Sequence, residues 1–277
     1  MRTEAICSLL YFIATSIGTV QADSFFIFDA GLQQSTGDYG QQTATTIEIM
    51  PLGITYIKNQ WSLQLEIAYL RIKGNGTVLP AAGNVVSNPG LDNLPPNANG
   101  PPGNPNNTNN TNAELRTSTG IGDTHLGLSY TFMPNRLKDI TLSVSSLIKF
   151  ATADEDKNLG TGENDYYIQL NATYGTENIA PFIALGYVVT GDTEIVNYKN
   201  VVFASLGLFY PLTPRLRSQI RYDYRDRNTQ QSAPFKQLNL SLEWLHSYQW
   251  AFNAGALLGL SDGAPDTGLS LGLTRYF

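Results

Sequence analysis

Residues 268–277 read Gly-Leu-Ser-Leu-Gly-Leu-Thr-Arg-Tyr-Phe, and this closing stretch carries the clearest pattern in the chain. Successive side chains of a β-strand point to opposite faces. One face of such a strand carries apolar groups, namely Leu269, Leu271, Leu273 and Phe277. The other face carries small or polar groups, namely Ser270, Gly272, Thr274 and Tyr276. The pattern therefore predicts a strand with a hydrophobic environment on one side only.

A strand of this kind that ends on an aromatic residue resembles the closing strand of bacterial outer-membrane β-barrels. In those proteins the closing strand is recognised by the barrel assembly machinery, which the resemblance implies as a partner of this chain. Phe277 holds the final position, whereas Arg275 stands two residues before it. An ordinary amphipathic edge strand fits the same residues, so the remaining strands must decide between the two interpretations.

The composition narrows the class of protein. Only 14% of the 277 residues are charged, and Gly is abundant, which favours strands and turns. No apolar run of the mature chain reaches the roughly 18 residues that a membrane-spanning helix requires. A β-barrel is the other structure that satisfies all backbone groups within a bilayer. The net charge of −6 argues against nucleic acid as a partner.

The N-terminus has the pattern of an export signal. Arg2 supplies a positive charge, residues 6–17 are mostly apolar, and Val20-Gln21-Ala22 is a small-x-small cleavage site. We therefore expect a signal peptide at residues 1–22 and an outer-membrane domain at residues 23–277. The one cysteine, Cys7, lies in the predicted signal, so the mature domain has no thiolate for a disulfide or a metal site.

Alternating apolar positions recur in segments of about ten residues separated by turn residues, which is typical of transmembrane barrels. A proline and a change of apolar parity at Met50-Pro51 predict a β-bulge. The expected fold is all-β, a closed antiparallel transmembrane β-barrel of twelve strands. The predicted strands are 25–33, 45–57, 61–73, 120–132, 140–151, 165–174, 180–190, 201–210, 216–225, 235–245, 250–260 and 268–277.

The connections alternate between short and long. Those after even-numbered strands are short and those after odd-numbered strands are generally longer, as expected for periplasmic turns and external loops. The longest, residues 74–119, is dominated by Gly, Pro and Asn. Such a stretch buries too little apolar surface to offset its ordering entropy, so we predict a largely disordered external loop.

Lipid and lipopolysaccharide of the outer membrane are the expected surroundings of the whole barrel.

Aromatic residues gather at predicted strand ends. Trp61, Trp244, Trp250 and Phe277 all fall at the periplasmic side of this topology. Tyr and Trp prefer membrane–water interfaces, because one part of the ring system is apolar and another part forms hydrogen bonds. We therefore expect these residues to mark the periplasmic interface.

Several short motifs occur together, and they are rich in Gly and Asp. They include Gly-Ile-Gly-Asp at 120–123, Lys149-Phe150 with Leu-Gly-Thr-Gly at 159–162, and Pro-Phe-Ile-Ala-Leu-Gly-Tyr-Val-Val-Thr-Gly-Asp at 181–192. With their spacing, the chain resembles a family of outer-membrane transporters named for the meta-pathway of phenol degradation. The resemblance implies a barrel that passes small molecules, aromatic or hydrophobic ones among them.

The inward-facing positions decide what such a lumen does. Nine charged or titratable residues are predicted to line it: Glu66, Asp123, His125, Lys149, Arg217, Arg221, Asp223, Arg225 and Glu243. Counting back from the loop at 226–234 places Arg217 opposite Glu243, and the short turn at 133–139 places Asp123 opposite Lys149. Cross-strand pairs of opposite charge stabilise a sheet. Two interpretations stay open: salt bridges that brace the wall, and an arginine constriction that attracts anionic or polar solutes.

Three further functions are weighed against a channel. A non-conducting barrel would act in adhesion or envelope structure through its external loops. A hydrolase would need His125 with Asp123 and a serine such as Ser129, which is about 13 Å from His125 at the rise of a strand. Acidic residues at 154–156, 163 and 165 offer oxygen ligands for a divalent cation in an external loop. The favoured prediction is a channel with no catalytic residue, no metal and no cofactor.

Overall fold

The computed structural model contains strands and no helix among the residues it describes. No helix in this part of the chain is long and apolar enough to cross a membrane. The predicted signal peptide at 1–22 lies outside the described residues. The described residues are 24–41, 43–74, 78–81, 84–87, 115–134, 139–176, 179–191, 198–229 and 232–277.

The strands form one closed antiparallel barrel and a separate two-stranded hairpin, β4 with β5. β6 and β7 follow one another along β3 and together make one position in the ring, which gives the twelve strands that were predicted. The strands are β1 Phe25–Gly37, β2 Thr45–Lys58, β3 Trp61–Gly74, β4 Val78–Ala81, β5 Asn84–Ser87, β6 Arg116–Ile121, β7 Thr124–Phe132, β8 Ile140–Phe150, β9 Asp165–Tyr174, β10 Ala180–Val189, β11 Val201–Thr213, β12 Leu216–Arg225, β13 Phe235–Leu245, β14 Trp250–Gly259 and β15 Thr267–Tyr276.

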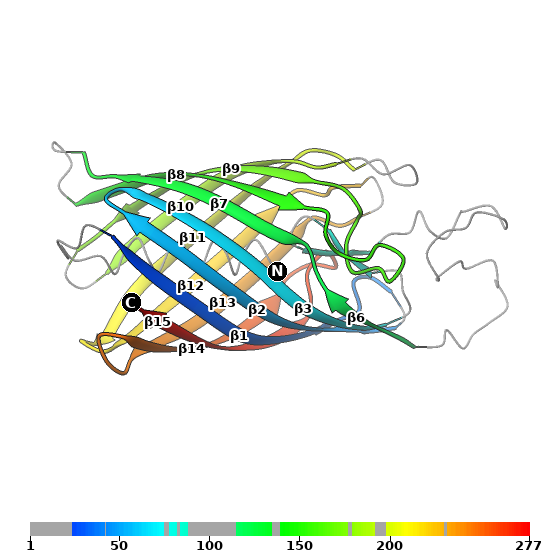
Figure 1. The fold of residues 1–277 in the computed structure, drawn as a ribbon. Coiled ribbons are helices and arrows are strands. Elements are labelled where there is room, and N and C mark those ends of the chain that lie inside the picture. Colours follow the sequence, from blue (N-terminus) through cyan, green and yellow to red (C-terminus); the bar gives the residue numbers. More distant parts are fainter. Residues whose placement is uncertain are drawn as a thin grey trace, which may run out of the picture.

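The first and last strands close the ring. β1 pairs with β15 from Ile27↔Tyr276 to Thr36↔Thr267, and on its other side β1 pairs with β2 (Figure 1). The amide of Phe277 donates to the carbonyl oxygen of Phe26 at 2.9 Å. Every strand of the cylinder therefore has two neighbours, except β6, which pairs with β3 alone.

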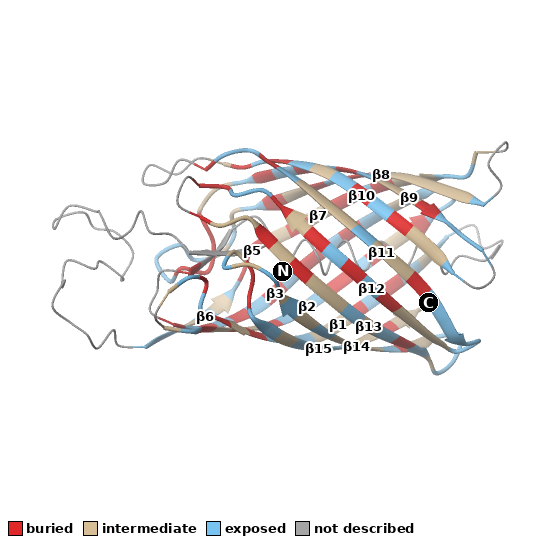
Figure 2. Cartoon of the chain, turned by 180° about the vertical axis from the view of Figure 1, so that it is seen from behind, coloured by how far each residue is buried: buried red, intermediate tan, exposed pale blue. Residues whose placement is uncertain are grey.

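Side chains alternate between the two surfaces of this wall, as Figure 2 shows by the change of burial along each strand. On β3 the outward side chains of Trp61, Leu63, Leu65, Ile67 and Tyr69 are 41–51% exposed, while Gln64, Glu66, Ala68, Leu70 and Ile72 are buried. Large apolar side chains on the outer surface fit a lipid environment. The outward and inward positions predicted on β3 and β15 are present in the structure.

The two ends of the barrel differ. The end that carries the chain's C-terminus has short turns, such as the Asn59-Gln60 turn between β2 and β3. The opposite end carries longer connections, and several of their side chains are almost fully buried. These are Tyr39, Leu159, Tyr198 and Ala264, one from each of four connections. The loops therefore fold over and into the mouth at this end, which we call the loop end.

The β-bulge predicted at Met50-Pro51 is wrong. β2 keeps one register with β3 from Thr46↔Lys73 to Lys58↔Trp61. The apolar parity changes because Ile47 and Ile49 face inward, where both are buried in an apolar cluster. The polarity of the barrel interior therefore changes along β2, while the pairing of β2 with β3 keeps one register.

The predicted loop at 74–119 is shorter than expected. Gly74 belongs to β3, and residues 116–119 belong to β6, which pairs with the end of β3. β4 and β5 form a hairpin inside the same range. Residues 75–77, 82–83 and 88–114 lie outside the described residues, so the predicted disorder of this range stays a prediction for them. The predicted strand ends at Gln33 and Tyr210 also fall short, because β1 and β11 run on to Gly37 and Thr213.

A charge placed on the outer surface tests the orientation of the wall. Leu206, in the middle of β11, is 60% exposed on the outward face. We expect Leu206→Arg to lower the free energy of unfolding by about 2–4 kcal/mol in bilayers, because a guanidinium near the bilayer midplane is poorly solvated. Tyr248→Arg, at a fully exposed position in the β13–β14 turn, is the control and should change little. Reversible urea unfolding in liposomes measures both, and equal values would contradict the orientation.

Candidate functional site

The nine residues predicted to line the lumen all lie on the inner side of the wall. Eight are buried, with exposed fractions of 2–6%, and the side chain of Arg217 is 30% exposed. Most occupy inward positions of strands, whereas Asp123 lies in the break between β6 and β7. The structure divides them into two clusters.

The first cluster lies toward the loop end. Glu66, His125, Lys149 and Asp165 face one another in register across β3, β7, β8 and β9. Lys149 Nζ lies 2.9 Å from Asp165 and 3.6 Å from Asp123, and it donates to Thr161 Oγ1 at 3.0 Å. The predicted Asp123–Lys149 contact is thus present, although the register partner of Lys149 on β7 is His125.

Asp165 belongs to this cluster, although the sequence did not predict it there. It was grouped with the acidic external loop, but it is fully buried and paired with Lys149. Asp154 of the same loop pairs with Lys157 at 2.8 Å on the surface. Across the described part of the chain, no group of three His, Cys, Asp or Glu residues is placed to hold a metal ion.

The second cluster follows β12 and β13. Arg221 Nε lies 2.8 Å from Asp223 Oδ2, which also accepts a hydrogen bond from Asn239 Nδ2 at 2.6 Å. Arg217 lies in register with Glu243 as predicted, with 3.6 Å between Nη1 and Oε2. Among the described residues on the inner wall, six buried carboxylates outnumber four cationic side chains. The ion pairs therefore favour bracing of the wall over an arginine constriction that attracts anions.

The β8–β9 connection, residues 151–164, enters the loop end of the lumen. Leu159 at its tip has no exposed surface and packs into the apolar cluster made by β2, β3 and their neighbours. Its side chain lies against the backbone of Gly120, where a Cβ would overlap it. The cluster consists of Tyr39, Ile47, Ile49, Ala68, Leu70, Ile72, Val78 and Leu159.

Asp123 joins this connection to the first charged cluster. One of its carboxylate oxygens accepts a hydrogen bond from the amide of Ala153 at 3.0 Å, while the other faces Lys149. Such a buried, charge-assisted contact is stronger than an exposed one. The position of residues 151–164 is therefore tied to the charged interior of the barrel.

Aromatic side chains cover the inner face of β10 and β11. Phe182 stands opposite Gly207, and Phe203 stands opposite Gly186, so each ring lies over a glycine on the facing strand. Phe182 also contacts the ring of Phe209, with 4.8 Å between centroids. The sequence signal was the run of apolar residues on both parities of β10, which marks a strand that is apolar on its inner and outer face alike.

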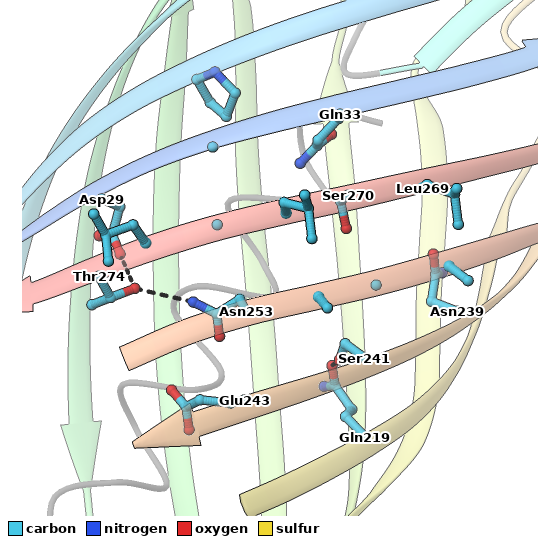
Figure 3. A pocket seen from close by; sticks show the side chains of 18 of the residues that line it. Asp29, Gln33, Gln219, Asn239, Ser241, Glu243, Asn253, Leu269, Ser270 and Thr274 are labelled. Carbon is cyan, nitrogen blue, oxygen red and sulfur yellow. Dashed lines mark hydrogen bonds between the residues drawn. The ribbon is translucent and has the colours of Figure 1, made fainter. Parts of the chain in front are cut away.

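A cavity of about 200 Å³ lies inside the barrel against β1, β13, β14 and β15. Glycines and other small residues form much of its wall, and Figure 3 shows the polar side chains that enter it. Thr274 Oγ1 donates to Asp29 Oδ1 at 2.7 Å and accepts from Asn253 Nδ2 at 3.2 Å. Glu243 and Gln219 line the same cavity from neighbouring strands. The cavity was not predicted, because it depends on which side chains meet across the lumen.

Ser129, the serine considered for a hydrolase, is hydrogen-bonded to another serine. Ser145 Oγ donates to Ser129 Oγ at 3.0 Å, and the two residues face each other in register. His125 lies in register with Glu66 and Lys149 instead. The geometry therefore offers no Ser–His pair at these two positions, and the prediction of a non-enzyme stays a prediction.

The four residues predicted at the membrane interface lie at the turn end of the barrel. Trp61, Trp244 and Phe277 are about half exposed or more on the outer surface, and Trp250 is partly exposed. The guanidinium carbon of Arg275 lies 4.8 Å from the ring centroid of Trp250 and 4.5 Å from that of Phe277. Arg275, which breaks the aromatic pattern of the closing strand, thus makes cation–π contacts with two of these aromatic rings.

Comparisons with known proteins identify the fold. No protein-family model and no curated protein sequence matches the chain. The structure is similar to an outer-membrane channel from Pseudomonas putida F1, with a TM-score of 0.67 and 13% identity over 94% of this chain and 98% of that one. It is also similar to the KdgM porin, with a TM-score of 0.52 and 8% identity over 90% and 99% of the two chains. The translocator domain of the autotransporter NalP from Neisseria meningitidis has a TM-score of 0.51 and 10% identity over 99% and 96%. The chain therefore has the fold of outer-membrane barrels.

Removal of the buried lysine tests the first cluster. Lys149→Ala leaves Asp123 and Asp165 buried without their cation, so we expect a loss of about 3–5 kcal/mol in the free energy of unfolding. Lys157→Ala removes an exposed partner of Asp154 and should change stability little, since surface pairs are screened by water. Unfolding of both variants in detergent micelles gives the comparison. A Lys149→Ala protein as stable as Lys157→Ala would show that the buried cluster does not brace the wall.

Proposed function

We propose that this barrel lets small molecules cross the outer membrane through its lumen, without chemistry or a cofactor. One observation carries the proposal. The lumen holds a cavity, and a folded connection, residues 151–164, covers the loop end of the barrel. A connection can move while the hydrogen-bonded wall stays intact, because it contributes no strand to the ring. Displacement of Leu159 would open the way to the interior.

The interior favours small solutes with apolar surface. The inner side of a porin is polar along its channel. Here an apolar cluster surrounds Leu159, and rings of Phe182, Phe203 and Phe209 cover part of the inner wall. Apolar and aromatic solutes would lose less hydration on entering such a lumen than sugars would. We therefore place small hydrophobic or aromatic molecules first among the transported classes.

The apolar inner wall is also consistent with membership of the transporter family of the meta-pathway of phenol degradation, which the sequence motifs resemble. The closed barrel and its apolar outer surface support an outer-membrane location, with the short turns in the periplasm. The second candidate is a non-conducting barrel that acts through its external loops. The extensive ion pairs around Lys149 and Asp223 favour that candidate, because they fill the lumen with side chains held in place.

Flux through liposomes separates the two candidates. We expect the wild-type barrel to admit small aromatic solutes such as phenol slowly. Leu159→Ser should raise the rate by about tenfold or more. Loss of roughly 2 kcal/mol of apolar burial shifts an equilibrium between closed and open loop by more than that factor. Uptake is measured by the entry of radiolabelled solute into vesicles of known protein content.

Leu260→Ser is the matched control, because Leu260 is half exposed at the same end of the barrel and outside the cluster. Its flux should equal that of the wild type. A series of phenol, a short fatty acid and a sugar then ranks the solutes. No uptake of any of them, by the wild type or by Leu159→Ser, would sink the transport proposal and favour the non-conducting barrel.

A further inference from the structure

The cavity beside β14 and β15 is acidic. Asp29, Glu66 and Glu243 are the carboxylates that line it, and Arg221 is the cationic side chain among its lining residues. Arg221 is itself paired with Asp223, outside the lining. The field within the cavity therefore favours positive charge.

Two of these carboxylates have an oxygen that accepts no hydrogen bond from the described residues. Asp29 is 91% buried, and its Oδ2 has no hydrogen-bond partner among the described residues, while Oδ1 accepts from Thr274. Glu243 is 98% buried, and its Oε2 likewise accepts no hydrogen bond from the described chain, since Arg217 is 3.6 Å away. Figure 3 shows both side chains at the turn-end side of the cavity.

A buried carboxylate is costly unless a cation or hydrogen-bond donors compensate its charge. Arg217 supplies one positive charge for the two groups, and Asp29 has no ion pair among the described residues. A ligand with an ammonium group would supply both the missing charge and three hydrogen-bond donors. Gln219 Nε2, also without a partner in the described chain, offers a donor to an oxygen of the same ligand.

We propose that this cavity binds the cationic group of a small organic amine, with Asp29 and Glu243 as acceptors. Its volume of about 200 Å³ is below the range of about 300–1,000 Å³ for drug-sized ligands, so the ligand is small. The inference rests on the proposed function and refines it. Among the small solutes admitted to the lumen, those with an ammonium group would be held at this site.

Equilibrium binding to the purified barrel in neutral detergent micelles tests the site without any need for transport. n-Propylammonium is titrated calorimetrically, with n-propanol and propionate as solutes of the same size at constant ionic strength. We expect n-propylammonium to bind at least about tenfold more tightly than either, since one charge-assisted contact suffices for such a factor. Equal affinities for n-propylammonium and n-propanol would overturn the proposal on the wild-type protein alone.

Two substitutions that remove a charge and preserve the size of the side chain then locate the site. Asp29→Asn and Glu243→Gln each remove one negative charge, so each should weaken n-propylammonium binding by about tenfold and leave n-propanol binding unchanged. Glu48→Gln is the control, because Glu48 pairs with Arg71 on the exposed surface. Unchanged affinity in both cavity variants, or an equal loss in the control, would contradict the assignment.

The binding test and the flux test have independent outcomes, so they distinguish failure of the amine site from failure of the channel. Absence of amine selectivity with intact phenol uptake would remove this site and leave the channel. Amine binding without uptake of any solute would remove the channel and leave a binding barrel. Folding of each variant is checked by its heat-dependent mobility on gels, which distinguishes a closed barrel from an unfolded chain.

Discussion

The structure depends on the satisfaction of backbone hydrogen bonds within a closed wall whose outer surface is apolar. An unpaired amide or carbonyl in hydrocarbon costs several kcal/mol, so a sheet in a bilayer must close on itself. The pairing of β1 with β15 provides that closure. Once the ring is closed, side chains need only alternate in polarity, and the interior is free to carry charges, rings and a cavity.

The fold was predictable from the sequence because a strand repeats every two residues. Apolar outward positions such as Leu269 and Leu271 locate a strand and its orientation without any knowledge of its neighbours. The same rule failed at Met50-Pro51, where it assumed that apolar residues face lipid. Ile47 and Ile49 face an apolar interior instead, and sequence alone does not distinguish two hydrophobic environments.

The site was predictable only in part. Parity identified the inward charges, and counting back from the loop at 226–234 gave the Arg217–Glu243 pair. The role of Asp165, the entry of Leu159 into the lumen and the cavity beside Asp29 were not foreseen. Each depends on contacts between elements separated by many residues or on the path of a loop, and neither follows from a local pattern.

The seam between β1 and β15 joins Ile27 to Tyr276, near the two ends of the described chain. No ring can close before nearly all of the polypeptide is present, so assembly is dominated by contacts of very large sequence separation, which form slowly. Until that step, β1 and β15 are two long unpaired edges with an apolar outer face, prone to pair with other chains. An unclosed chain of this architecture is therefore prone to mispairing, and this vulnerability ends in one event, when the two edges meet.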